Sequence, residues 1–270
     1  MDAPSATPCR LRCLRALRVL ELRFKADRLP SIRGALIDAG PCPYLPDRRF
    51  HAFHVADEVD DGLYRVLLDN RFRRNGAMFY RPTCEGCEAC QPIRVAVAGF
   101  APRRDQRRAW RRNADLAFAW QPRGIDDERV ALWRSYQETV HDDLDDEPPT
   151  RFMTDDAGIS GGELHARTAD GRLLGVALCD VVGDAWSSVY CYWDPAERDR
   201  GLGTVLAMAE IAEAARQGMR WWYSGFWVAG CAKMTYKARF GPAEVLVNGR
   251  WIALQDRKRP EDPVVEGASG

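Results

Sequence analysis

The sequence has no net charge, no long apolar run and no internal repeat. No stretch approaches the ~18 consecutive apolar residues that a membrane span needs, and no apolar segment typical of a secretory signal follows the first residues. We therefore expect a cytoplasmic protein without a membrane partner. Its 270 residues, 46% hydrophobic and 29% charged, suffice for one large folded domain or two of ordinary size.

The net charge of zero conceals an uneven distribution of charge along the chain. Residues 1–125 contain 23 Lys and Arg against 14 Asp and Glu, whereas residues 126–270 contain 16 against 25. A basic half indicates a polyanionic partner. We interpret the Arg-rich residues 1–35 as a poorly ordered basic extension rather than a targeting segment, and residues 257–270 as a polar tail.

Between these ends the chain divides into two predicted domains. Residues 36–124 are interpreted as a smaller, Cys-containing α/β domain, and residues 125–256 as a larger domain. The elements expected in the smaller domain are an alternating strand ending at residue 56, a helix over residues 61–76 closed by Gly76, a strand over residues 93–100, a helix over residues 103–116 and a strand over residues 116–122.

The larger domain begins with an expected helix over residues 126–141, capped by Asp126 or Asp127. Turn signals then separate three strands between residues 163 and 195. The elements expected after them are a helix over residues 204–219, a strand over 220–228, a short helix over 231–240 and a hairpin over 241–254.

A loop with the pattern R-x-x-G-x-G precedes the long helix of this domain. Arg198, Gly201 and Gly203 would present backbone N–H groups and the positive end of the helix to an anion. An ordinary Gly-containing turn is the alternative. The strand–strand–strand–loop–helix–strand order around this loop resembles the acetyltransferase fold known as GNAT, which predicts an α+β protein with a GNAT-like C-terminal domain.

Arginine pairs recur every four residues in "RRDQRRAWRRN". On a helix they form two adjacent columns of guanidinium groups. Repulsion between these charges destabilises the helix unless phosphates neutralise them. Trp110 adds a possible stacking surface. RNA is therefore a plausible partner, and a solvated helix face is the alternative. The residues concerned are Arg103, Arg104, Arg107, Arg108, Arg111 and Arg112.

Three cysteines at intervals of three, Cys84, Cys87 and Cys90, supply thiolates of the kind that bind zinc or an iron–sulfur cluster. A fourth ligand must come from elsewhere, and Cys42 in a Pro-rich loop is the natural candidate, with His51 or His54 as substitutes. Without a second C-x-x-C pair the spacing is equally compatible with buried thiols that hold no metal.

A compact basic segment follows the strand "RWWYSGFWV". Lys233 and Lys237 lie one helical turn apart, and Arg239 follows closely. Cations beside aromatic residues suit an anionic acceptor or the end of a tRNA. The alternative is a basic helix C-terminus, where cations are favoured by the helix dipole.

Together these motifs resemble the bacterial aspartate/glutamate leucyltransferases, relatives of the eukaryotic arginyl-tRNA–protein transferases. The resemblance runs from Cys42 to Trp251 through "CPYL", "MFYRPTCEGCEACQPIRV", "RRDQRRAWRRN" and "KMTYKARFGPAEVLVNGRW". It implies transfer of leucine from Leu-tRNA to the N-terminal amine of proteins beginning with Asp or Glu, which creates a degradation signal. It also implies a GNAT-like fold that takes a charged tRNA in place of acetyl-CoA and needs no cofactor for transfer.

Within the matching motif, the resemblance implies that Lys233, Tyr236, Lys237 and Arg239 contact the acidic acceptor or the tRNA 3′ end. Eukaryotic relatives carry a regulatory cysteine cluster in the region of Cys84, which implies a structural or regulatory metal rather than a catalytic one. An arginyltransferase, an acetyl-CoA-dependent N-acetyltransferase and a metal-stabilised RNA-binding module are the alternatives. The sequence departs from the family in an unusually acidic stretch over residues 135–152 and in residues 1–35.

Overall fold

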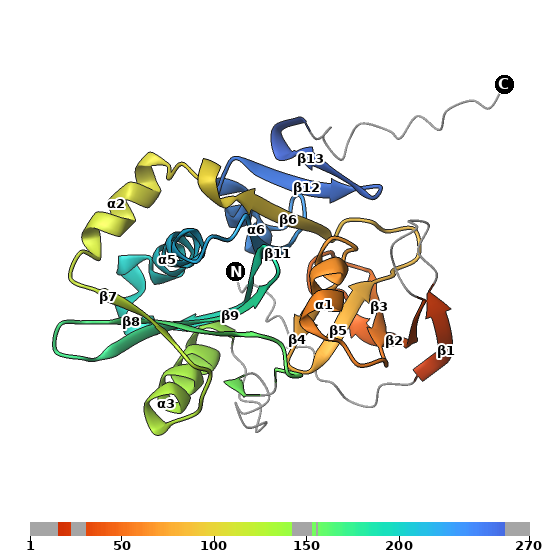
Figure 1. The fold of residues 1–270 in the computed structure, drawn as a ribbon, viewed down its shortest axis with the longest axis horizontal. Helices are drawn as coiled ribbons and strands as arrows, with labels where there is room; N and C mark the ends of the chain where they lie inside the picture. Colours follow the sequence, from red (N-terminus) through yellow and green to blue (C-terminus); the bar gives the residue numbers. More distant parts are fainter. Residues whose placement is uncertain (1–15, 23–30, 142–152, 155, 257–270) are drawn as a thin grey trace.

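The computed structural model describes residues 16–22, 31–141, 153–154 and 156–256, which form two sheets (Figure 1). The smaller sheet has five antiparallel strands in the order β1-β2-β3-β5-β4. Its strands are β1 (Ala16–Leu22), β2 (Ile32–Pro41), β3 (Arg49–Val55), β4 (Arg73–Asn75) and β5 (Met78–Pro82).

The larger sheet has eight strands in the order β13-β12-β6-β11-β10-β9-β8-β7. All neighbours in it are antiparallel except β10 and β11. Its strands are β6 (Gln91–Ala96), β7 (Ala117–Gln121), β8 (Gly161–Arg167), β9 (Leu173–Val182), β10 (Ala185–Trp193), β11 (Trp221–Trp227), β12 (Ala243–Val247) and β13 (Arg250–Ala253).

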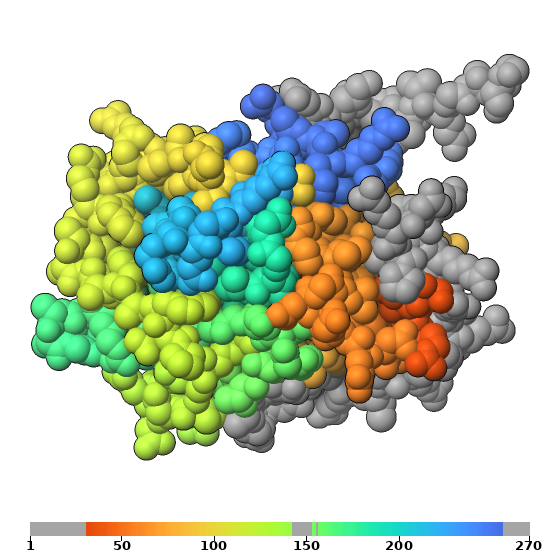
Figure 2. Space-filling view, in the orientation of Figure 1, coloured from red at the N-terminus to blue at the C-terminus, as the bar shows by residue number. Residues whose placement is uncertain are grey.

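Helices cover both faces of the larger sheet (Figure 1). Successive residues of β9 point to opposite faces: Ala177 packs in the core cluster of α5 (Leu202–Arg216), whereas Val176 packs in the cluster of α3 (Asp127–Tyr136). Helix α2 (Arg104–Arg112) lies against α5, and Figure 2 shows the two on one face of the molecule. None of the described helices is long and apolar enough to cross a membrane.

The predicted α+β class is confirmed, and so is the strand–strand–strand–loop–helix–strand order from β8 to β11. The helix predicted to begin after Asp126 is α3, and the Asp126 side chain accepts a hydrogen bond from the backbone of Arg129 as its N-cap. The predicted short helix over residues 231–240 is α6 (Ala232–Thr235) followed by a 3-10 turn, η4 (Tyr236–Arg239). The acidic loop over residues 142–152 lies outside the described residues.

The division between the sheets differs from the predicted domain boundary at residues 124/125. Strands β6 and β7 belong to the larger sheet, and β6 is paired on both edges, with β11 and β12. Residues 91–95 are buried, and a neighbouring strand pairs with each edge of β6. The smaller unit is therefore an antiparallel sheet with one described helix, α1 (Asp61–Leu68).

One local prediction in the N-terminal half is wrong. The helix expected over residues 61–76 ends at Leu68, and Arg71 has a positive φ of 67° that turns the chain into β4. Burial of Phe72 and the next residues against the sheets outweighs the helical pattern. Of residues 1–35, predicted to be a poorly ordered extension, the structure describes 16–22 and 31–35, where β1 pairs with β2.

The two sheets are joined by a shared core and a buried ion cluster. Apolar residues of α1 pack with Val182 and Trp221 of the larger sheet, and the smaller sheet's segment lies directly against the larger sheet in Figure 2. Arg74 of β4 and Arg123 both bind Asp180 of β9 with N–O distances of 2.6 Å. The cluster therefore fixes the position of β4 relative to the larger sheet.

Candidate functional site

Strands β10 and β11 pair only at one end and then diverge. They are hydrogen-bonded from Ala185–Ser187 to Trp221–Tyr223, beyond which β10 is irregular after Ser188 and β11 after Tyr223. Two cations, Arg73 and Lys237, lie at this opening. Arg73 Nη2 donates to the Ser188 carbonyl at 2.7 Å, and Lys237 Nζ donates to the Phe226 carbonyl at 2.8 Å. Side chains thus replace the missing strand–strand bonds.

Both cations are buried: Arg73 is 6% exposed and Lys237 is 9% exposed. Burial, together with repulsion from the Arg73 guanidinium, lowers the pKa of Lys237 to about 7. Arg73 Nη1 is buried and has no hydrogen-bond partner among the described residues. The opening is therefore electropositive and lacks a described counter-ion.

Gly225 gives the two cations their space. Its φ of +97° is a conformation that side chains disfavour. A Cβ atom at this position would lie 3.1 Å from Lys237 Nζ and 3.6 Å from Arg73 Nη2. Both charged groups thus converge on a point that only glycine leaves open.

The other predicted contact residues do not join Lys237 in one cluster. Lys233 is exposed on α6, and Arg239 pairs with Asp105 of α2. The Tyr236 ring is 46% exposed, and its centroid lies 6.0 Å from Lys237 Nζ. The change from α-helix to 3-10 turn after Thr235 sends Lys233 and Lys237 in different directions, which the four-residue spacing did not indicate.

Glu210 of α5 lies beneath the opening and was not predicted from the sequence. Its carboxylate accepts hydrogen bonds from the Ser188 hydroxyl at 3.1 Å and from the Trp186 and Trp222 indoles. Burial raises the pKa of Glu210 to about 7, although these donors oppose the rise. The sequence did indicate its burial, because Glu210 lies four residues from both Leu206 and Ala214 on the apolar face of α5.

Replacing Glu210 by glutamine is expected to change how stability depends on pH. The unfolded chain loses the Glu210 proton near pH ~4.3, whereas the folded protein keeps it to about pH 7. The group's stabilising contribution is therefore complete at low pH and lost as pH rises through this window. We expect wild type to lose on the order of 3 kcal/mol relative to E210Q between these pH values in urea unfolding.

The matched control for this measurement is Glu213→Gln on the same helix. The Arg216 hydrogen bond lowers the pKa of Glu213, so its contribution has the opposite sign and is lost as pH falls. Parallel unfolding curves for wild type and E210Q across the window would contradict the assignment to Glu210.

The predicted anion loop lies at the N-terminus of α5. Gly201, with a φ of 71°, links the turn Pro195–Arg200 to the helix, and Gly203 lies against the Trp193 indole. Arg198 is exposed, and its carbonyl accepts a hydrogen bond from Gly201 N. Thr204 N and Val205 N bond to the Gly201 carbonyl, so the positive end of this 15-residue helix lies at the loop.

The arginine helix is attached to this loop. Arg112 donates to the Asp199 carbonyl, and Asn113 Nδ2 donates to the Arg200 carbonyl at 2.9 Å. Arg200 returns a bond to Asn113 Oδ1 at 2.8 Å. The structure therefore brings together two motifs that are about ninety residues apart in sequence, the arginine columns and the R-x-x-G-x-G loop.

All six predicted arginines of this segment are exposed. Arg103 is the N-cap residue of α2, and Arg107 donates to the Pro102 carbonyl. Besides Arg112, already described, the side chains of Arg104, Arg108 and Arg111 remain, and these have no hydrogen-bond or ion-pair partner among the described residues. Beside them, Trp110 stacks on Phe118 at the edge of a groove of about 460 Å³ between α2 and α5.

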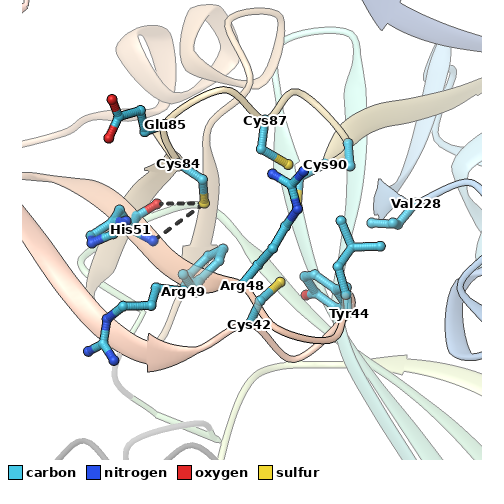
Figure 3. A pocket seen from close by; sticks show the side chains of 13 residues that line it. Cys42, Tyr44, Arg48, Arg49, His51, Cys84, Glu85, Cys87, Cys90 and Val228 are labelled. Atoms are coloured by element: carbon cyan, nitrogen blue, oxygen red, sulfur yellow. Dashed lines mark hydrogen bonds between the residues drawn. The ribbon is translucent and has the colours of Figure 1, made fainter. Parts of the chain in front are cut away.

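The four predicted metal ligands line one pocket of about 190 Å³ (Figure 3). Cys42 follows β2 and the other three lie between β5 and β6, and burial with the neighbouring thiols raises the pKa of Cys90 to about 12. His51 lines the pocket too, and its backbone N–H contacts Cys84 Sγ at 3.4 Å.

The pocket contains soft thiol donors, but their sulfur atoms are not arranged around a common metal position. No three His, Cys, Asp or Glu side chains in the described part of the chain are placed to hold a metal ion. The donor type nevertheless suits zinc or iron–sulfur chemistry. Binding a metal would require the thiols to rotate toward one centre.

Comparison with known proteins gives a consistent family. Residues 40–108 match the family model "Arginine-tRNA-protein transferase, N terminus" and residues 128–247 match "Arginine-tRNA-protein transferase, C terminus". An aspartate/glutamate leucyltransferase of Pseudomonas paraeruginosa is 38% identical over 224 residues, which are 79% of this chain and 93% of that protein. One of Saccharophagus degradans is 38% identical over 221 residues, with the same shares covered.

Among solved structures, FemX is similar to this chain with a TM-score of 0.45 and 8% sequence identity. The similarity covers 82% of this chain and 84% of the FemX chain.

Proposed function

The chain belongs to the arginine-tRNA-protein transferase family, and we propose that it moves leucine from Leu-tRNA to the N-terminal amine of proteins beginning with Asp or Glu. The curated relatives that cover most of the chain are named for this activity. The product would carry an N-terminal leucine that marks it for degradation. A charged tRNA as donor would place the reaction in the cytoplasm.

The reaction needs little chemical assistance beyond positioning. The acceptor α-amine attacks the carbonyl carbon of the aminoacyl ester, a peptide bond forms, and the bond to the tRNA ribose oxygen breaks. The amine releases a proton and the ribose oxygen takes one, so the exchange balances without a redox partner. Because an N-terminal amine has a pKa near ~8, its deprotonation costs little at neutral pH.

The observation that carries the proposal is the contact between the arginine helix α2 and the loop before α5. An acetyl-CoA enzyme would need the loop alone, whereas a tRNA donor needs an extended cationic surface next to it. The exposed arginines of α2 provide such a surface. Arg198, Gly201 and Gly203 would then face a phosphate near the 3′ end of the donor.

A label-transfer assay tests the proposal directly. The full-length protein is incubated with labelled Leu-tRNA, Arg-tRNA or acetyl-CoA and with peptides that begin with Asp, Glu or Arg. Leucine on the Asp and Glu peptides alone is the expected result. Arginine on the same peptides would make the protein an arginyltransferase, and an acetyl label or no label would overturn tRNA-dependent transfer.

Neutralising two arginines of α2 is expected to weaken donor binding selectively. The Arg104→Ala/Arg108→Ala variant should raise KM for charged tRNA by about tenfold at roughly 0.15 M salt. It should also reduce the slope of log affinity against log salt by about two, one per phosphate contact. The value of kcat should change little, because these side chains lie on an exposed helix face.

Arg134→Ala is the matched control, since this exposed arginine lies on α3, which packs in a different core cluster from α5. An unchanged KM and salt slope for the double variant would identify the arginine columns as a merely solvated face.

For the cysteine pocket we propose a structural or regulatory metal, zinc or an iron–sulfur cluster, held by Cys42, Cys84, Cys87 and Cys90. The support is that four thiols line one pocket. Metal analysis of anaerobically purified protein tests it: wild type and Cys191→Ser should retain metal and Cys87→Ser should lose it. Metal-free wild type would end this proposal without affecting the transfer reaction.

A further inference from the structure

We infer that Arg73 and Lys237 together bind the side-chain carboxylate of the acceptor's N-terminal Asp or Glu. The inference rests on the proposed transfer to acidic N-termini and assigns a place in the fold to that selectivity. Arg73 comes from β4 of the smaller sheet, and Lys237 follows β11 of the larger one. The carboxylate site would therefore be built by both sheets.

The first argument is an unused donor. Arg73 Nη2 is held by the Ser188 carbonyl at 2.7 Å, which fixes the plane of the guanidinium. Its Nη1 atom is buried and unpartnered among the described residues. Leaving a charged donor unsatisfied in the interior costs about 1–3 kcal/mol or more, so the arrangement is expected to have an acceptor in its working state.

The second argument is an uncompensated pair of positive charges. Other buried arginines are matched by acids, as Arg74 is by Asp180 and Arg94 by Asp69 and Glu244. Arg73 and Lys237 have no carboxylate within ion-pair distance in the described part of the chain. A bound carboxylate would supply the missing negative charge, and a neutral amide would not.

The third argument is shape. Both cations lie within 4 Å of the point where a Cβ of Gly225 would be, so a side chain at this position would crowd both charged groups. Two enclosed cations at 6% and 9% exposure suit a carboxylate on a short side chain. The phosphates of a folded RNA need an open cationic surface, which α2 provides instead.

The expected consequence is a loss of acidic selectivity when Arg73 is neutralised. Arg73→Gln should lower kcat/KM for an Asp-starting peptide on the order of 30-fold or more. Transfer to a matching Asn-starting peptide should fall by a much smaller factor, so the Asp/Asn ratio of kcat/KM should drop. A purely structural role for Arg73 would instead lower transfer to both peptides equally.

Two further variants keep the test informative if Arg73→Gln does not fold. Arg73→Lys retains a positive charge on a shorter side chain, so preference should shift from Asp toward the longer Glu. Arg65→Gln is the control, because this half-buried arginine of α1 already pairs with Asp69 and Asp184. Its Asp/Asn ratio should equal that of wild type, whatever its stability.

A binding measurement separates this inference from the proposed function. Calorimetry with Asp-Ala and Asn-Ala dipeptides should detect binding of the first alone to wild type, and Arg73→Lys should bind it more weakly. If wild type transfers leucine but an unchanged Asp/Asn ratio is found in both Arg73 variants, the carboxylate site is wrong and the function stands. If the Arg73 variants raise KM for Leu-tRNA equally with every peptide, Arg73 and Lys237 bind the tRNA donor and not the acceptor.

Discussion

Replacing Asp180 by alanine is expected to lower the free energy of unfolding by about 3–5 kcal/mol. The Asp180 carboxylate is fully buried and accepts bonds from Arg74 Nη2 and Nε, at 2.6 and 3.0 Å, and from Arg123 Nη2 at 2.6 Å. Its removal leaves two guanidinium groups in the interior without their shared counter-ion. Urea unfolding followed by circular dichroism measures the difference.

The control for this prediction is Asp184→Ala at the next turn. Asp184 also binds an arginine, Arg65, at 2.6 Å, but its side chain is 44% exposed. Exposed ion pairs contribute about 0–1 kcal/mol, so D184A should differ little from wild type. Equal losses for the two variants would show that burial does not set the strength of the Asp180 cluster.

Since Arg74 belongs to the smaller sheet, D180A should also make the junction between the sheets more susceptible to proteolysis.

Replacing Lys237 by methionine is expected to lower kcat/KM for Asp- and Glu-starting peptides by about 100-fold. Methionine fills the space of the aliphatic stem but removes the ammonium that would contact the acceptor carboxylate. It also leaves the Phe226 carbonyl without its described donor. The effect should appear in transfer to acidic peptides, with KM for Leu-tRNA unchanged.

The same variant should alter the pH profile. Burial and repulsion from Arg73 lower the pKa of Lys237 to about 7, so its ammonium loses charge as pH rises above neutral. The attacking amine gains reactivity up to its own pKa near ~8. Wild type should therefore show a bell-shaped kcat/KM, and K237M should lose the alkaline decline.

Lys233→Met provides the control, because this exposed lysine lies one turn earlier on α6. Its pH profile and acidic selectivity should match those of wild type. A K237M variant that retains the alkaline decline would assign that limb to another group and remove the pH evidence for Lys237.

Local sequence patterns predicted the elements that local physics determines. The stripe of apolar residues in α5, the turns between β8, β9 and β10, and the Asp126 cap of α3 all depend on neighbours within a few residues. The loop at Gly201 and the six arginines of α2 were found for the same reason. Functional residues that are close together in sequence form motifs that can be recognised from the sequence alone.

Features that depend on distant partners were missed. The positive φ of Arg71 ends the predicted helix because Phe72 and the β4 arginines are needed in the interior. Strand β6 looked like part of the smaller domain because its partners, β11 and β12, follow more than a hundred residues later. Arg73 and Glu210 belong to no sequence motif. They stand out only in the structure, where both side chains are buried and hydrogen-bonded to Ser188.

The position of β6 has a consequence for the order in which the protein can be completed during synthesis. Its two neighbours, β11 and β12, end at Trp227 and Val247, so both edges of β6 stay unpaired until most of the chain has left the ribosome. Such long-range pairing is slow and leaves strand edges available for wrong contacts. A nascent chain halted before β11 would expose an apolar strand at the centre of an unfinished sheet, which makes this stage of translation the one at which a chaperone is most needed.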